Sequence, residues 1–315
     1  MQFDFLKCHG SGNDFPLIDA RATDLDDAAW ASVARALADR AGPVGGDGLL
    51  LLTPGDDDHA FGMRMFNSDG SEAETCLNGL RCVARAGFEA LAIERARVRL
   101  KTSSAEVARD GDLAPGVYTV RETVGPFGTD TTSWPLRIER AETIEQVIAP
   151  LSATRAFTAV AMPNPHLVSF VEAIDEEALV RLGRACEAAP EWLPNRANVS
   201  FVEQRGPAAL FVRTFERGVG LTDSCGSAMA ASVAAAGLTG RIAFGTPVTV
   251  FNAGGLVRGR AEADGMVELS GNATFEWRGS AEVDLGHARA GDVTVVHHFN
   301  DEIAAWAAVA DDGAH

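Results

Sequence analysis

The chain has 315 residues, of which 46% are hydrophobic, and a formal net charge of −17 at pH 7. This size is sufficient for two domains with buried cores, and the longest apolar stretch, around residues 228–238, is too short to span a bilayer. The acidic excess, with no cluster of Lys or Arg, argues against nucleic acid as a partner because phosphate binding requires a basic surface.

The first part of the chain has the pattern of strands followed by one helix. Its opening segment, MQFDFLKCHGSGNDF, does not have the form of a secretory signal, which predicts a cytoplasmic protein. Apolar runs of strand length and composition span residues 15–20, 48–52 and 63–66. An alanine-rich segment with helical spacing predicts a buried helix over 80–91. Alternation and turn residues then predict a hairpin over 97–110.

The second part repeats this pattern. Strand-like runs span residues 166–171, 197–202 and 210–215, a buried helix is predicted over 227–238, and further strands are predicted within 247–271. Pairs of equivalent residues follow each other in the same order at nearly constant separation: Asn13 and Asn164 (151 positions), Gly48 and Asn198 (150), and Cys76 and Cys225 (149). This order favours a single internal duplication.

These elements predict an α+β fold of two pseudo-symmetric lobes, each a mostly antiparallel sheet or barrel around a central helix. The turn-rich segment 125–135 predicts the boundary. We expect an N-terminal lobe over residues 1–130, joined by a strand from about 275–285, and a C-terminal lobe over 131–274. Residues 285–315 lie outside both repeats, and we expect them to form an extra tail with one short amphipathic helix and a frayed end.

Each half places a cysteine directly before its predicted helix, in CLNG at 76–79 and CGSA at 225–228. A helix N-terminus offers backbone N–H groups that stabilise a thiolate and bind a neighbouring carboxylate. A lone cysteine is more often a buried core residue, but repetition of the whole loop favours chemistry. An odd number of cysteines, five, is a poor disulfide framework and predicts reduced thiols.

Two lobes related by a pseudo-twofold axis would bring both thiols to one cleft. Inversion of a carbon that bears hydrogen needs a base on one face and an acid on the other, with the carboxylate held where enolate charge develops. The paired loops therefore predict a racemase or epimerase. On these motifs the chain resembles the diaminopimelate epimerase family. The matching stretches, between about residues 1 and 275, are GSGNDF, GGDGLL, FNSDGSEAETCLNGLRC, NPH, RANVSF and ERGVGLTDSCGSA.

The resemblance implies a cofactor-independent enzyme that converts LL-diaminopimelate to meso-diaminopimelate, for lysine and peptidoglycan synthesis, with Cys76 and Cys225 as its two bases. It implies that the reacting carboxylate is held by Leu77, Asn78, Gly226 and Ser227. It implies that the far end of the substrate is bound by Asn13, Asn67, Asn164, Asn198, Glu216 and Arg217, with His166 as an assisting residue. The residue types agree, because guanidinium binds a carboxylate, while a carboxylate and amide oxygens accept from an ammonium group.

The chain departs from the family pattern at Leu77, where members usually have glycine in CGNG. Leu77 still supplies a backbone N–H but adds bulk beside the reacting centre. Gly48 replaces a glutamine of some members and Leu221 a glutamate of others. A racemase or epimerase of the same fold acting on histidine, proline or hydroxyproline is therefore one alternative. A non-catalytic amino-acid-binding protein or a thiol redox sensor is another.

The remaining expectations concern cofactors and partners. Neither a dinucleotide nor a metal is expected, because the glycines near residue 10 lack a complete fingerprint and the histidines at 287, 297 and 298 lack recognised metal-ligand spacing. We expect Cys8, Cys82 and Cys186 to be core residues. The expected partner is a small-molecule amino acid, with no nucleic acid and no membrane. Members of the family are often homodimers, an assembly that the sequence neither supports nor opposes.

Overall fold

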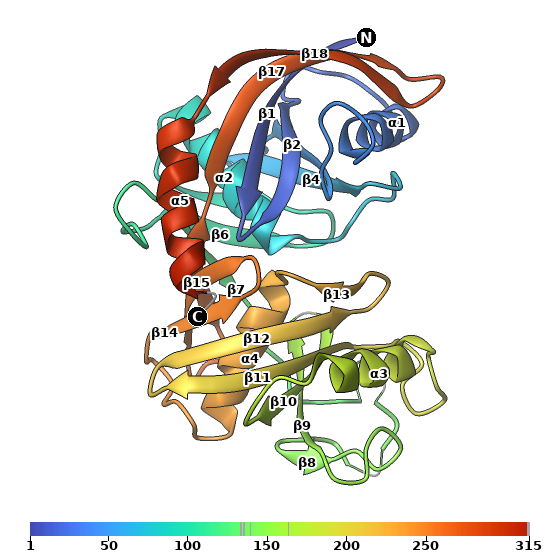
Figure 1. Cartoon of the computed structure of the whole chain (residues 1–315), viewed down its shortest axis with the longest axis vertical. Helices are drawn as coiled ribbons and strands as arrows, with labels where there is room; N and C mark the ends of the chain where they lie inside the picture. Colours follow the sequence, from blue (N-terminus) through green and yellow to red (C-terminus); the bar gives the residue numbers. More distant parts are fainter. Residues whose placement is uncertain (133, 135, 139, 163, 314–315) are drawn as a thin grey trace. The chain divides into compact units, whose positions relative to one another are not determined.

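The structure, a computed structural model, describes residues 1–132, 134, 136–138, 140–162 and 164–313. It contains two compact units (Figure 1). The first comprises Met1–Glu122 and Ser270–Asp312; the second comprises residues 123–269, with which Gly313 is grouped. Positions 133 and 135 of the predicted boundary segment and positions 314–315 of the predicted tail lie outside the described residues.

The first unit is one sheet with two helices packed against it and a third at the end of the chain. The strands are β1 (Gln2–Gly10), β2 (Asn13–Asp19), β3 (Gly48–Pro54), β4 (Phe61–Asn67), β5 (Arg95–Arg99), β6 (Ser104–Arg109), β17 (Thr274–Asp284) and β18 (Arg289–His298). The helices are α1 (Asp27–Ala38), α2 (Leu77–Leu91) and α5 (Asn300–Gly313). Hydrogen bonding gives the order β18-β17-β1-β2-β3-β4-β5-β6, in which only β2–β3 and β4–β5 are parallel pairs among those described.

The second unit repeats this arrangement. Its strands are β8 (Gln146–Val147), β9 (Ala156–Met162), β10 (Asn164–Val171), β11 (Asn198–Gly206), β12 (Ala209–Glu216), β13 (Gly220–Thr222), β14 (Val248–Asn252) and β15 (Gly255–Ala261), and its helices are α3 (Glu176–Glu187) and α4 (Gly226–Leu238). The parallel pairs are again β10–β11, which flank α3, and β12–β14, which flank α4. Strands β7 (Thr119–Val124) and β16 (Val267–Asn272) contain the points where the chain passes from one unit to the other.

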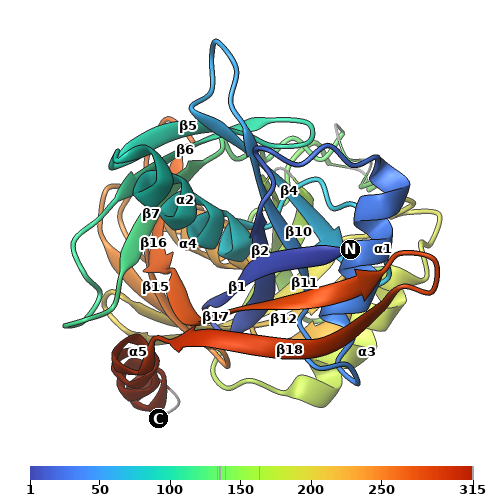
Figure 2. The same ribbon diagram turned by 90° about the horizontal axis from the view of Figure 1, so that it is seen from above.

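A buried helix occupies the centre of each unit. Helix α2 contacts all of β1 to β6, and in Figures 1 and 2 it lies inside the curve of these strands. Helix α4 contacts β9 to β12, β14 and β15 in the same way. Strand β3 is apolar throughout Leu49–Leu52 because one face packs under α1 and the other faces α2. The predictions of an α+β fold, mostly antiparallel strands and two buried central helices are confirmed.

Three elements differ from the sequence expectations. Helices α1 and α3 were not predicted; each begins at an aspartate, Asp26 or Asp175, whose side chain accepts a hydrogen bond from a backbone N–H of the first turn. The acidic run at 175–177 therefore starts a helix. In the predicted tail, residues 289–298 form β18, which pairs with β17 and belongs to the first unit.

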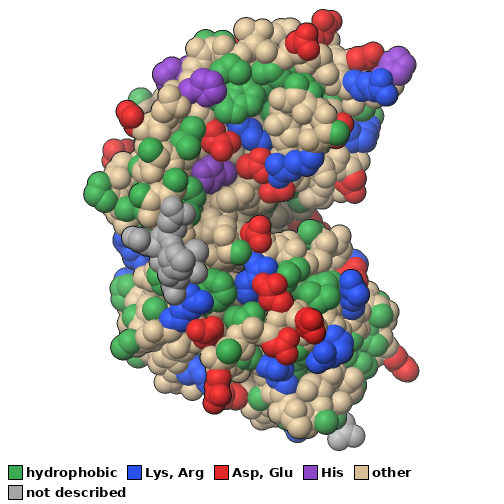
Figure 3. All heavy atoms as spheres, in the orientation of Figure 1, with side chains coloured by type: hydrophobic (Ala, Val, Ile, Leu, Met, Phe, Trp, Pro, Cys, Tyr) green, Lys and Arg blue, Asp and Glu red, His purple; other side chains and the backbone are tan. Residues whose placement is uncertain are grey.

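Acidic and basic side chains are interspersed on the face shown in Figure 3. Within the described residues, no helix combines the length and the apolar character needed to cross a membrane.

Candidate active site

The loop before Cys76 is fixed by an arginine and a short antiparallel bridge. Phe66, near the end of β4, bridges Glu72 on the returning chain. Arg64 donates from Nε to Glu72 (2.7 Å) and from Nη2 to Asp27 at the start of α1 (2.7 Å). The arginine therefore joins the loop to a helix end and defines where the chain turns into α2.

Cys76 is the N-cap residue of α2, as predicted. Its Sγ accepts a hydrogen bond from the backbone N–H of Gly79 (3.4 Å), and its thiol donates to Oδ1 of Asn13 (3.8 Å). The cysteine is partly buried. A backbone N–H at a helix N-terminus is a donor that stabilises negative charge on sulfur, while the Asn13 oxygen accepts from a protonated thiol. Both protonation states of Cys76 therefore have a partner.

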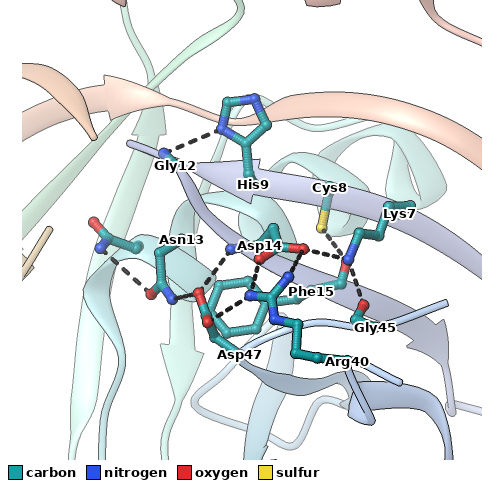
Figure 4. Close-up of polar contacts among 11 residues, drawn as sticks. Lys7, Cys8, His9, Gly12, Asn13, Asp14, Phe15, Arg40, Gly45 and Asp47 are labelled. Atoms are coloured by element: carbon teal, nitrogen blue, oxygen red, sulfur yellow. Dashed lines mark hydrogen bonds and ion pairs between the residues drawn. The ribbon is translucent and has the colours of Figure 1, made fainter. Parts of the chain in front are cut away.

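Asn13 is held in one orientation by a charged network (Figure 4). Its Nδ2 donates to Asp47 Oδ2, and a carboxylate can only accept, so Asn13 Oδ1 faces Cys76. Arg40 donates to Asp47 (2.7 Å) and to Asp14 (Nη1–Oδ2 3.1 Å), and Lys7 also donates to Asp14. These ion pairs connect the strand that begins at Asn13 to the loop before β3.

Asn78, two positions after Cys76, is oriented from the opposite side by a buried arginine. Arg81 Nη2 donates to Asn78 Oδ1 (2.8 Å), which leaves Asn78 Nδ2 to donate to Asn13 Oδ1 (3.5 Å). Arg81 is fully buried and paired with Glu122 (2.8 Å); burial raises the pKa of Glu122 to about 7. The carboxylate of Asp47, which can only accept, and the guanidinium of Arg81, which can only donate, therefore set the direction of the hydrogen bonds around Cys76.

The loop before Cys225 is built in the same way. Phe215 pairs with Leu221 of β13, and Arg213 donates from Nε to Glu176 at the start of α3 (2.6 Å) and from Nη1 to the Thr222 carbonyl (3.1 Å). The arginine two positions before each phenylalanine therefore has the same role in both units. It anchors the cysteine loop to the start of a helix.

Cys225 is the N-cap residue of α4 and is buried, with 8% of its surface exposed. Its Sγ lies 3.5 Å from Ser227 Oγ. Burial raises the pKa of this thiol well above its usual value, and the neighbouring Glu216 carboxylate raises it further. Hydrogen bonds from Ser227 and from the Ala228 backbone act in the opposite direction. The second thiol is thus more buried than the first and lies beside a carboxylate.

The other predicted residues of the second unit lie at strand ends. Asn198 begins β11, and its Oδ1 accepts from the backbone N–H of Arg217 (3.0 Å). Glu216 ends β12 and accepts from Thr222 Oγ1 (2.5 Å). Arg217 donates from Nη1 to the Asn195 carbonyl (3.1 Å). These bonds hold the end of β12 and the residue that follows it.

Asn164 begins β10 at the position that Asn13 has in β2, and its Oδ1 lies 3.1 Å from Nε2 of His166. His166 is fully buried; burial, and then the charge of Arg217, lower its pKa to about 3. The ring is therefore neutral near neutral pH, which suits it to orienting Asn164. Asn67 ends β4, and its Nδ2 donates to Ser71 Oγ (3.0 Å).

Within the first unit, the structure brings Asn13, Cys76 and Asn78 together. Within the second, it brings together three neighbouring pairs: Cys225 with Ser227, Asn164 with His166, and Asn198 with Arg217. Leu77 and Gly226 are the first residues of α2 and α4 and are buried. Sequence reasoning missed Asp47 and Arg81. Both lie inside the quoted motifs, in GGDGLL and LNGLRC, where a charge among small or apolar residues was the available signal.

Among the described residues, no three His, Cys, Asp or Glu side chains gather in a way that could hold a metal ion. His287 instead pairs with Asp284 (2.8 Å), and the His297 ring lies edge-on to Phe299.

The family model and the curated relatives agree on one family. The model of the diaminopimelate epimerase family matches residues 5–113 and 158–276. A diaminopimelate epimerase from Clostridium acetobutylicum is 39% identical over 290 residues, which cover 90% of this chain and 87% of that protein. One from Listeria innocua is 37% identical over 293 residues, covering 90% and 89%. The solved structure of a probable proline racemase from Agrobacterium radiobacter matches with a TM-score of 0.60 and 15% identity, covering 90% of this chain and 93% of that one, a likeness of fold.

Proposed function

The chain belongs to the diaminopimelate epimerase family and is an isomerase, and from this premise we propose that Cys76 and Cys225 are the two acid–base groups of its reaction. The substrate is LL-diaminopimelate and the product is meso-diaminopimelate, or the reverse. The observation that carries the assignment is the repeated placement of a cysteine at the N-cap of the central helix of each unit. Two equivalent thiols are what a two-base inversion requires.

The reaction is balanced without a cofactor. One cysteine, as thiolate, takes the α-proton of the amino acid, and the other, as thiol, gives a proton to the opposite face of the same carbon. The electron pair left at the α-carbon is delocalised into the α-carboxylate. At the end the two sulfurs have exchanged protonation states, and the reverse reaction restores them.

The N-termini of α2 and α4 are the positive ends of the helix dipoles and can stabilise the negative charge that develops on the substrate carboxylate. The backbone N–H groups of residues 77 and 78, and those of 226 and 227, are first-turn donors with no carbonyl partner within their own helix. We propose that they hold the reacting carboxylate, where they stabilise developing enolate charge. This proposal explains why the residues that follow each cysteine have small or amide side chains, with Leu77 as the exception.

The far end of the substrate is assigned to the amide and charged side chains of the site. Arg217 presents a planar cation that suits a second carboxylate, and Glu216 with the asparagines suits a second ammonium group. We propose that Asn13, Asn67, Asn164 and Asn198 complete this set. Such a set selects an amino acid with two zwitterionic ends.

A racemase or epimerase for an amino acid with a single head group is the second candidate, and Leu77 is the observation that favours it. This side chain is buried beside Cys76, at the position where the family usually has glycine. Under this candidate Glu216 and Arg217 contribute less to substrate selection, and a proline-like ring packs against Leu77.

We also propose a cytoplasmic location, where thiols stay reduced. The mechanism requires Cys76 and Cys225 as thiols, and the described structure, which includes all five cysteines, contains no disulfide.

The proposal is tested by proton NMR of LL-diaminopimelate in deuterium oxide with reduced protein. We expect meso product with deuterium at the inverted carbon. Parallel samples contain histidine, proline and hydroxyproline; exchange with one of these and none with diaminopimelate would support the second candidate. Lack of exchange with all four amino acids would favour a non-catalytic binding or sensing protein.

A further inference from the structure

The last strand and helix of the first unit lie beyond the family pattern. The family model matches up to residue 276, whereas β18 and α5 occupy residues 289–313. Figure 2 shows α5 following β18 at the end of the chain. The family resemblance therefore assigns no role to β18 or α5.

One contact joins α5 to the helix that begins at Cys76. Glu302 accepts from Arg85 of α2 at both carboxylate oxygens, with Nη2–Oε1 at 2.8 Å, and also from the backbone N–H of Phe275 (3.3 Å). Arg85 is itself nearly buried, and its guanidinium lies over the rings of Phe275 (3.7 Å) and Tyr118 (4.3 Å). Together with Glu89 of the same helix, which accepts from Arg85 Nε (2.9 Å), Glu302 therefore fixes a cation on the second half of α2.

A second contact joins α5 to the turn that carries Asn13. Trp306 is 6% exposed, and its ring centroid lies 5.8 Å from that of His9. His9 Nδ1 accepts from the backbone N–H of Gly12 (3.3 Å), which closes the turn directly before Asn13 (Figure 4). Burial lowers the pKa of His9 to about 4, so the ring is neutral and can accept at Nδ1.

These two contacts fall on the two segments that meet at the candidate active site. The turn at residues 9–13 carries Asn13, and α2 begins at Cys76; the two residues meet at the 3.8 Å contact between Cys76 Sγ and Asn13 Oδ1. We propose that α5 is a clasp that holds these segments in register, with Glu302 and Trp306 as positioning residues for Cys76. This inference rests on the proposed function for its kinetic consequence only.

The test compares variants of the full chain that loosen the clasp with variants that destabilise equally elsewhere. Trp306→Ala and Glu302→Gln remove the two contacts, and Trp306→Phe keeps an aromatic ring over His9. Trp30→Ala is the matched control in the same unit, because Trp30 is 3% exposed in α1 and packs on Phe3. Glu145→Gln is the control for the charge, because it breaks the ion pair with Arg241 in the second unit.

Two measurements are made on each variant. Epimerisation kinetics should show kcat reduced about 10-fold by Trp306→Ala with KM within about twofold, since positioning of the base is lost while substrate contacts remain. Glu302→Gln should act in the same direction. Hydrogen–deuterium exchange should rise in peptides that cover residues 8–14 and 76–84 and stay unchanged in peptides of α4. Trp306→Phe should restore both values.

Two outcomes overturn the clasp. One is a kcat and an exchange pattern in Trp306→Ala equal to those of the wild type. The other is equal loss of kcat in Trp30→Ala at the same fall in Tm, which would make α5 a source of general stability alone. If wild-type protein has no activity on diaminopimelate, the proposed function fails instead, and the exchange experiment still decides whether α5 holds the two segments.

Discussion

The helices that follow the two cysteines occupy equivalent places in their units but are buried by different means. Helix α2 carries Arg81 and Arg85, each held by a carboxylate from a distant part of the chain. At the equivalent positions α4 has Ala230 and Ala234, both fully buried, and most of its other buried residues are also alanine. The duplication therefore keeps the position of the helix N-terminus while the forces that hold the helix have diverged.

The thiols differ accordingly. Cys76 is partly buried, and the neighbouring Asn13 and Asn78 are hydrogen-bonded to the charged side chains of Asp47 and Arg81. Cys225 is buried next to Glu216, and its pKa is raised. A two-base reaction needs one thiolate and one thiol at any moment, so unequal surroundings are compatible with the chemistry.

The largest expected effect on stability comes from Arg81→Met. It leaves Glu122 buried without its cation and forces this carboxyl, whose pKa is already about 7 beside Arg81, to take up a proton on folding. Loss of such a buried pair costs ~3–5 kcal/mol of unfolding free energy. Urea unfolding at pH 7 measures this loss. The double variant Arg81→Met/Glu122→Gln should recover a large part of it, because glutamine is neutral without taking up a proton. A double variant as unstable as the single one would contradict the role of the ion pair.

Gly79→Ala should have the next largest effect. The added Cβ would lie 2.6 Å from Leu50 Cδ2 and 3.4 Å from Cys76 Sγ, so the buried Leu50 side chain or the helix start must shift. Overpacking of this kind costs about 1–3 kcal/mol. The equivalent residue in α4 is already alanine, Ala228. Equal stability of wild type and Gly79→Ala in urea unfolding would show that the two helix starts are interchangeable.

Asp47→Ala should lower kcat/KM about 10-fold with little change in Tm. Without the carboxylate, the Asn13 amide can rotate and present its nitrogen to Cys76, which misplaces the acceptor of the thiol proton. Steady-state kinetics measure the effect. The matched control is Asp19→Ala, which breaks the exposed pair between Asp19, the last residue of β2, and Arg21 (2.7 Å). Equal losses in both variants would contradict an orienting role for Asp47.

The smallest expected effect is on the titration of Cys225. Glu216 is the second cause of its raised pKa after burial, so Glu216→Gln should lower that pKa while leaving it above the usual value. At a given pH more thiolate is then present, and the alkylation of Cys225 by iodoacetamide, followed by peptide mass spectrometry, should shift to lower pH. Glu203→Gln on the adjacent strand is the control. An unchanged pH dependence of alkylation in Glu216→Gln would show that Glu216 does not raise the pKa of Cys225.

The sequence was informative where the signal was local and repeated. A cysteine followed by apolar residues at helical spacing was enough to predict that Cys76 and Cys225 begin helices, because N-cap position and helical periodicity are short-range properties. The apolar run at Leu49–Leu52 was likewise enough to predict a strand. The arginines that anchor the two loops, Arg64 and Arg213, are separated by the same 149 positions as the two cysteines, but the sequence does not indicate which helix ends they bind.

Other features depend on contacts that a single sequence does not encode locally. Arg81 finds Glu122 41 positions away, so its burial was not predictable from its helix. Strand β18 is exposed along most of its length, so no buried face marks it in the sequence; the β-branched run at 293–296 was the available strand signal. Helices α1 and α3 could have been found from Asp26 and Asp175, since aspartate before an apolar periodic run is a helix-start signal.

The most direct test of the central assignment is the epimerisation rate of Cys76→Ala and Cys225→Ala, measured side by side with Cys186→Ala, a buried cysteine of α3. The two-base account predicts that each of the first two variants loses roughly 10²–10⁴-fold in kcat while Cys186→Ala remains active, because either missing thiol removes an obligatory proton transfer. Retention of wild-type kcat by Cys76→Ala or by Cys225→Ala would contradict the account.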